Sequence, residues 1–215
     1  ATATKKKTDE AAGKEEKGGK AEKKARAEKK TKSASAETVK VKKSGKNKDG
    51  GKDLKQNEHS SKLKIIPLGG LEQIGMNITA FEYEDSIIVV DCGLSFPEDD
   101  MYGIDLVIPD ITYLKDNIDK VKGFFITHGH EDHIGAIPYV LKEVNAPIYA
   151  TKLTNGIIEH KLKEHNMLTK VKRKVVKYGQ HINLGCFRVE FIKTNHSIQD
   201  AAALAIYSPA GIVVH

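Results

Sequence analysis

The chain has 215 residues, with 35 basic and 29 acidic side chains and a formal net charge of +6. No stretch approaches the ~18 consecutive apolar residues of a membrane span, and the N-terminus lacks the apolar segment of a secretory signal. Cys92 and Cys186 form no Cys-x-x-Cys pair, which favours reduced core thiols in a cytoplasmic protein over a disulfide scaffold or a membrane protein.

The basic charge is concentrated in residues 1–62, which carry 20 basic and 10 acidic side chains and no aromatic residue. Such a composition buries too little apolar surface to offset the entropy of ordering, so we predict a disordered Lys-rich N-terminal extension. Two interpretations stay open for it. It is either a solvated tail without a specific partner, or an electrostatic tether to a polyanion such as RNA, a ribosome or an RNA-decay assembly.

Residues 63–215 show the patterns of a folded domain. Apolar runs predict strands at residues 63–68, 76–83, 86–91, 123–127, 147–150, 187–194, 202–207 and 211–215. Apolar residues at helical spacing predict helices at about residues 134–144 and 152–165. An antiparallel meander followed by strand–helix units predicts an α/β fold whose sheets are covered by helices. Because the chain stops inside an apolar strand, we expect it to be part of a longer polypeptide.

The segment FFITHGHEDHIG, residues 124–135, carries the strongest chemical signal. His128 and His130 alternate around Gly129 after a buried strand, and Asp132 and His133 follow where a helix begins. Imidazole nitrogens and a carboxylate oxygen without thiolate are typical of a catalytic zinc site rather than a structural one. A lone histidine is usually an ordinary residue, but four ligand-type side chains at His-x-His-x-Asp-His spacing predict a metal centre.

Two residues from other strands complete the prediction. His196 follows the strand at 187–194, at the mouth of a sheet, and the first cluster makes it a candidate ligand. Asp91 ends the strand at 86–91 and would be buried. We therefore predict that it orients a ligand histidine or backbone groups of residues 128–133, called the metal loop below. We interpret His160, His165 and His181 as surface or loop residues and assign no role to His215.

The string HGHEDH resembles the metal-binding signature of the metallo-β-lactamase fold. GLSFPEDDMYGIDLVIPD at 93–110, with Gly69-Gly70-Leu71, Ile74-Gly75 and Asn77, is more specifically similar to bacterial ribonuclease J. The resemblance covers residues 63–215 and implies the N-terminal portion of an αββα sandwich. It implies that His128, His130 and His196 bind one zinc ion, that Asp132 and His133 bind the other, and that Asp91 matches an acid of the family.

The resemblance also implies an activity. Two Zn²⁺ ions, or Mn²⁺, would activate a hydroxide that attacks the phosphodiester, in a cytoplasmic, homo-oligomeric 5′-to-3′ exonuclease and endonuclease of RNA maturation and decay. Its substrate would be single-stranded RNA, preferably with a 5′-monophosphate. The family's bridging aspartate and its inserted β-CASP domain would follow residue 215, so the 215-residue chain alone is expected to be inactive. The alternatives are a small-ester or thioester metallo-hydrolase and a non-catalytic RNA-binding fragment.

Overall fold

The computed structural model describes residues 61–215, so residues 1–60 of the predicted disordered extension lie outside the described residues. The first sheet has six strands in the order β1-β2-β3-β4-β5-β6. Antiparallel pairing joins the first three, and parallel pairing joins β3 through β6. Its strands are β1 (Lys64–Gly69), β2 (Ile78–Tyr83), β3 (Ser86–Val90), β4 (Val121–Phe125), β5 (Ile148–Ala150) and β6 (Arg173–Val175).

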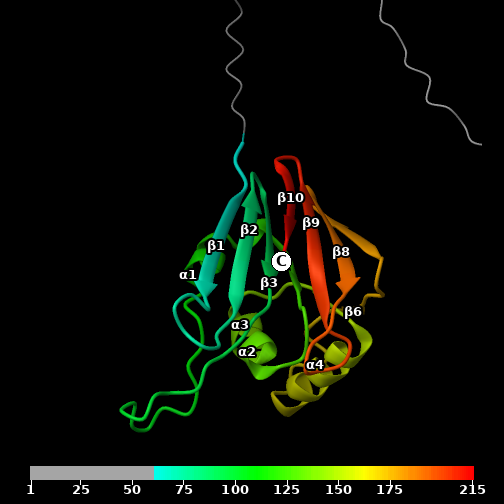
Figure 1. Ribbon diagram of the computed structural model, residues 1–215. Coiled ribbons are helices and arrows are strands. Elements are labelled where there is room, and N and C mark those ends of the chain that lie inside the picture. The colour runs from blue at the N-terminus through cyan, green and yellow to red at the C-terminus, as the bar shows by residue number, and fades with distance from the viewer. Residues whose placement is uncertain (1–60) are drawn as a thin grey trace, which may run out of the picture. The chain divides into compact units, whose positions relative to one another are not determined.

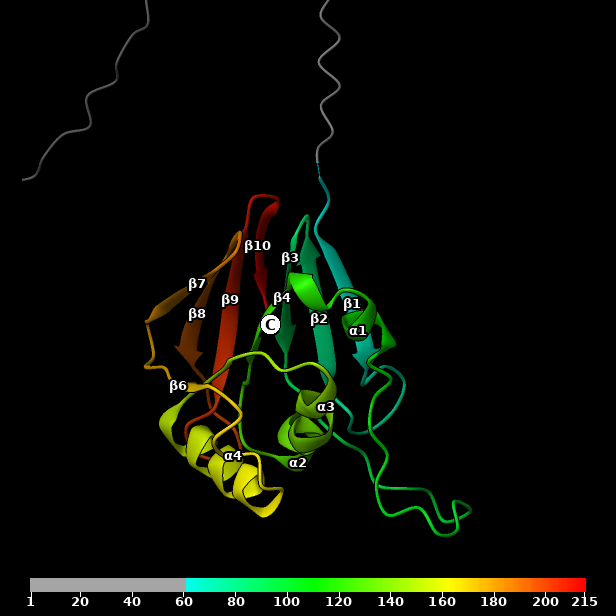
Figure 2. The same cartoon turned by 180° about the vertical axis from the view of Figure 1, so that it is seen from behind.

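The second sheet is antiparallel throughout and has four strands in the order β10-β9-β8-β7. Figures 1 and 2 show it beside the first sheet, with α2, α3 and α4 at the lower end of the strands in both views. The strands are β7 (His181–Leu184), β8 (Phe187–Lys193), β9 (Ala202–Ser208) and β10 (Gly211–Val214), and the helices are α1 (Thr112–Asp116), the 3₁₀ turn η1 (Ile118–Lys120), α2 (Glu131–Ile134), α3 (Ile137–Glu143) and α4 (Lys152–Glu164).

Strand β3 shows how the sequence builds the layers. Its side chains alternate between faces, so Ile87 and Val89 pack with the helices, whereas Ile88 and Val90 face the second sheet. A strand buried on both faces reads as a continuous apolar run, which explains the sequence SIIVV. Within the described residues the helices pack only on the first sheet, so the chain forms three layers of the four-layer sandwich that the resemblance implied.

The structure confirms the predicted fold class, the antiparallel meander and all eight predicted strands to within about two residues. The helix predicted at about 134–144 is α3, which starts only at Ile137, because a break at residues 135–136 separates it from the short helix α2 at 131–134. A Cβ at Gly135 would lie 2.3 Å from Cγ of Leu94, so the break brings the chain close to the segment after β3. His181, predicted as a surface or loop residue, lies in β7 opposite Glu190.

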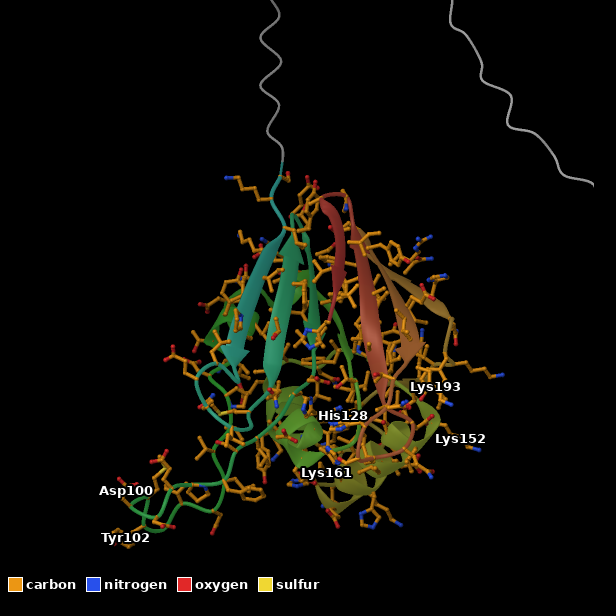
Figure 3. The ribbon with its side chains drawn as sticks, viewed as in Figure 1. Asp100, Tyr102, His128, Lys152, Lys161 and Lys193 are labelled. Atoms are coloured by element: carbon orange, nitrogen blue, oxygen red, sulfur yellow. The ribbon has the colours of Figure 1, made fainter. Side chains whose placement is uncertain are left out.

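The loop between β3 and α1 projects from the body of the domain (Figures 1 and 2), and Figure 3 shows Asp100 and Tyr102 at its tip. Tyr102 is 92% exposed there. Among residues 61–215, no helix combines the length and apolar character needed to cross a membrane.

A buried carboxylate joins β1, β2 and α1. Glu82 is 3% exposed and accepts hydrogen bonds from the Tyr113 hydroxyl, from Lys120 Nζ at 3.0 Å and from Lys64 Nζ at 3.2 Å. Burial acts to raise the pKa of Glu82, but these hydrogen bonds outweigh it and lower that pKa below its ordinary value. Burial and the contact with Glu82 raise the pKa of Tyr113 to about 12.

We expect Glu82→Gln to lower the free energy of unfolding at neutral pH by about 1–3 kcal/mol, because an amide cannot serve all three donors equally well. The carboxylate's contribution is present above its ordinary pKa and is lost as the pH falls through its lowered value. Urea unfolding at neutral and acidic pH measures both effects, with the exposed Glu98→Gln as control. A Glu82→Gln variant that matched the control at neutral pH would contradict this role.

Candidate metal centre

The candidate site lies where neighbouring parallel strands end. Asp91 follows β3, and residues 126–130 follow β4, so both segments reach the same edge of the first sheet. The carboxyl ends of parallel strands are the usual position of ligand sites in such sheets. The short helix α2 then begins at Glu131 and carries Asp132 and His133.

His196 comes from the second sheet, in the loop between β8 and β9. This loop is anchored to the first sheet at two points. The amide of Ala202 donates to the carbonyl of Thr127 at 2.9 Å, and the Thr151 hydroxyl donates to the carbonyl of Asp200 at 2.8 Å. These contacts hold the loop against the end of β4, so His196 meets residues distant from it in sequence.

Three imidazoles converge at this edge. One ring nitrogen from each of His128, His130 and His196 lies within 4.8 Å of the other two, and Nε2 of His128 is 3.0 Å from Nε2 of His196. Tetrahedral zinc with bonds of about 2.0–2.1 Å to nitrogen brings its ligand atoms about 3.4 Å apart. The donor set therefore fits one divalent metal ion. Figure 3 shows His128 below the strands and above Lys161.

Asp132 and His133 form a second pair of potential ligands beside these histidines. The His133 Nε2 atom lies 3.5 Å from Oδ2 of Asp132, and the rings of His128 and His133 have centroids 4.0 Å apart. The side-chain amide of Asn77 is 3.2 Å from both His133 Nε2 and Asp132 Oδ2. The pair is thus next to the three-histidine cluster, but in the described residues it supplies only two ligand atoms of its own.

Asp91 links the ends of β3 and β4 to α2 by hydrogen bonds. Its carboxylate is 1% exposed and accepts hydrogen bonds from His133 Nδ1 at 2.7 Å, from the Thr127 amide at 2.8 Å and from the Thr127 hydroxyl at 2.9 and 3.0 Å. Asp91 also has a positive φ of 60°, an uncommon conformation for a non-glycine residue and one that is found at functional sites.

These hydrogen bonds set the tautomers of two ring systems. Because Asp91 is acceptor-only when ionised, the proton between it and His133 lies on Nδ1, and Nε2 presents a lone pair. The Thr127 hydroxyl gives its proton to Asp91, so at 2.9 Å it accepts one from Nδ1 of His128. One carboxylate thus leaves Nε2 of both His128 and His133 available as candidate metal ligands.

The pKa shift of His128 agrees with this arrangement. Burial, followed by the neighbouring His133, lowers the pKa of His128 to about 4, so its imidazole is neutral at neutral pH. For His133, burial acts to lower the pKa, but the hydrogen bond and charge of Asp91 outweigh it and the pKa is raised. Burial and then Asp91 raise the pKa of the neighbouring Cys92 thiol, which leaves it protonated and a poor metal ligand.

Two residues with contacts in the site had no predicted role. Asn77 and Thr127 both lie beside strand ends, but only the folded structure brings Asn77 to Asp132 across 55 positions. Of the other histidines, His160 faces Glu164 on α4, and His165 packs edge-on against Tyr139. His215 packs edge-on against Phe81, and its backbone pairs with Leu204. None of these belongs to the three-histidine cluster.

Comparison with known proteins gives a consistent result. The family profile described as Metallo-beta-lactamase superfamily matches residues 74–194. The chain is 47% identical over 164 residues to Ribonuclease J of Synechocystis sp., covering 75% of this chain and 26% of that protein. It is 44% identical over 161 residues to Ribonuclease J 1 of Streptococcus pyogenes, covering 75% and 28%. The chain therefore spans about a quarter of the length of these curated relatives.

A solved structure also resembles the domain. A crystal structure of a protein of unknown function from Enterococcus faecalis V583 has a TM-score of 0.55 at 20% identity, covering 71% of this chain and 42% of that chain. At this identity the likeness concerns the fold alone, and it agrees with the layered α/β arrangement of residues 61–215.

Proposed function

This chain belongs to the metallo-beta-lactamase superfamily, and we propose that it is the metal-binding portion of a metal-dependent ribonuclease of the ribonuclease J type. The observation that carries the proposal is the convergence of His128, His130 and His196 from two sheets in a chain so similar to proteins named Ribonuclease J. We propose these three as ligands of one ion and Asp132 and His133 as ligands of a second, with zinc or manganese as the ions.

A divalent ion held by these residues would supply Lewis acidity and lower the pKa of a coordinated water toward neutrality. The chain's own residues prepare that site. Asp91 keeps the Nδ1 proton on His133 and, through Thr127, on His128, so both Nε2 atoms stay available. The Asn77 amide is within hydrogen-bonding distance of Asp132 and restrains the orientation of its carboxylate.

The finer parts of the proposal rest on the resemblance to ribonuclease J. They are 5′-to-3′ exonucleolytic and endonucleolytic cleavage in RNA maturation and decay, a preference for a 5′-monophosphate, a homo-oligomeric assembly, contact with a ribosome or decay assembly, and a place in the cytoplasm. We also propose a domain boundary near residue 62. The basic extension before it would add sequence-independent affinity for RNA, through counterion release.

The test uses the polypeptide translated from the complete gene, with single-stranded RNA that bears a 5′-monophosphate and with Zn²⁺ or Mn²⁺ supplied. We expect mononucleotide release that chelation abolishes and that Asp132→Ala reduces to background, because the variant lacks one proposed ligand. The control is Asp116→Ala, an exposed carboxylate at the end of α1. RNA left intact by a protein with bound metal would refute the nuclease and favour a small-substrate hydrolase or a non-catalytic RNA binder.

A further inference from the structure

A groove of about 1310 Å³ runs from the histidine cluster along α4. One wall is α4, the other is the segment from Lys193 to Asp200, and His196 lies in that second wall. His196 therefore belongs both to the cluster and to the groove, so a molecule in the groove lies directly beside the proposed metal ligands.

The inner wall of this groove is apolar and continuous with the metal loop. Ile157 and Ile198 line the groove, and both lie over Gly129, between His128 and His130. A Cβ at Gly129 would be 2.6 Å from Cδ1 of Ile157 and 3.6 Å from Cδ1 of Ile198. With the 41% exposed Leu153 and the ring of Tyr178, these side chains offer an apolar surface of the kind on which a ribose or base packs.

The charged side chains of the groove differ in whether they have partners. Glu131 pairs with Lys161 at 2.9 Å, and Glu164 lies 3.4 Å from His160. Asp200 accepts hydrogen bonds from the amide of Leu153 at 2.8 Å and from the Tyr178 hydroxyl at 3.2 Å, so it is engaged at the start of α4.

Lys152 and Lys193 are different. Across residues 61–215, no carboxylate oxygen lies within 4 Å of either ammonium group, although both side chains line the groove. Figure 3 shows Lys152 and Lys193 to the right of His128, and Lys161 below His128. The groove thus has two cations without a carboxylate partner within the described residues.

We propose that this groove binds the RNA strand next to the cleavage site, with Lys152 and Lys193 contacting a backbone phosphate and Ile157, Ile198 and Tyr178 packing against the attached nucleoside. The proposal rests on the proposed function for its choice of RNA as the anion. The groove is larger than most small-molecule pockets, which are commonly about 300–1,000 Å³, so it has room for a segment of a polymer. Lysines without a carboxylate partner can pair with backbone phosphates, and phosphate contacts dominate the affinity of proteins for nucleic acids.

The test measures binding without cleavage. A fluorescein-labelled single-stranded oligoribonucleotide is titrated with the 215-residue chain in EDTA over a series of KCl concentrations, and anisotropy reports the affinity. We expect Lys152→Ala/Lys193→Ala to weaken binding about tenfold at low salt and to reduce the slope of log K against log [KCl] by about 0.7 per lysine. Lys152→Arg/Lys193→Arg should retain wild-type binding.

The matched control is Lys163→Ala/Lys170→Ala, which removes the same charge from exposed lysines outside the groove. Every variant keeps residues 1–62, so the basic extension contributes equally to all. Equal weakening by the two alanine pairs, no weakening by the groove pair, or no RNA binding by the wild type would overturn the groove proposal. The nuclease proposal is judged separately. If the complete protein cleaves RNA equally well with and without Lys152 and Lys193, the nuclease proposal holds and the groove proposal fails. If the groove lysines are needed for RNA binding but no RNA is cleaved, the groove proposal holds and the nuclease proposal fails.

Discussion

A His196→Ala variant is expected to bind Zn²⁺ at least about 100-fold more weakly than the wild type. The change removes one of three converging imidazoles, and even residues that only orient a ligand cost 10- to 100-fold in metal affinity when altered. His196 is the informative choice because it alone comes from the second sheet. Removing His196 leaves the HGHEDH segment intact, so the variant tests whether that segment alone is enough to bind zinc tightly.

Competition with a chelating dye at neutral pH measures this affinity, and thermal unfolding without metal checks that the fold is retained. The matched control is His160→Ala, which removes a histidine that also lines the groove but lies outside the three-histidine cluster. His196 is exposed, so its removal should leave the metal-free stability within about 0.5 kcal/mol of the wild type. If His196→Ala and His160→Ala bound zinc equally well, the three-histidine site would be wrong.

Gly93→Ala is expected to abolish stable folding or to lower the free energy of unfolding by more than about 4 kcal/mol. A Cβ at this position would lie 1.6 Å from the carbonyl oxygen of Asp132, 2.2 Å from its carbonyl carbon and 2.9 Å from the amide nitrogen of Asn77. All three are backbone atoms, so no side chain can rotate away to relieve the clash.

The clash is severe because three backbone segments meet at Gly93. Its amide donates to the carbonyl of Asn77 at 3.0 Å, and the amide of Asn77 donates to the carbonyl of Asp132 at 3.0 Å. The amide of Cys92 donates to the carbonyl of His133 at 2.7 Å. Separating these segments would therefore break the hydrogen bonds that fix the position of the metal loop.

Gly156→Ala is the control for this prediction. Gly156 lies within α4, and a Cβ there would meet no atom within 4 Å, so alanine should stabilise the helix by about 0.5–1 kcal/mol. Urea unfolding followed by circular dichroism compares the two variants. A Gly93→Ala protein as stable as Gly156→Ala would contradict the close backbone packing described for the metal loop.

Much of the fold could be predicted because its strands carry clear patterns. The run at 86–91 is apolar throughout because β3 is buried on both faces, and the alternation in β8 follows from one buried and one exposed face. The edge strand β6, of sequence RKV, was missed because three largely exposed residues show no hydrophobic period. The five-residue helix α1 was missed for a similar reason, since only Leu114 is buried.

The site was predictable to the extent that its residues are adjacent in sequence. The spacing of His128, His130, Asp132 and His133 indicates metal chemistry by itself, and a position at a strand end made Asp91 and His196 candidates. The contacts of Asn77 and Thr127 could not be predicted, because they depend on which loops the tertiary structure brings together. The groove along α4 required the packing of the β8–β9 loop against α4, which no local pattern indicates.

The most direct test of the central claim, that His128, His130 and His196 hold one metal ion, is X-ray absorption spectroscopy of the protein loaded with one equivalent of Zn²⁺. We expect a nearest shell of nitrogen and oxygen at about 2.0–2.1 Å, with the outer-shell scattering of three imidazoles in the wild type and of two in His196→Ala. A sulfur neighbour at about 2.3 Å, or an imidazole count unchanged by His196→Ala, would contradict it.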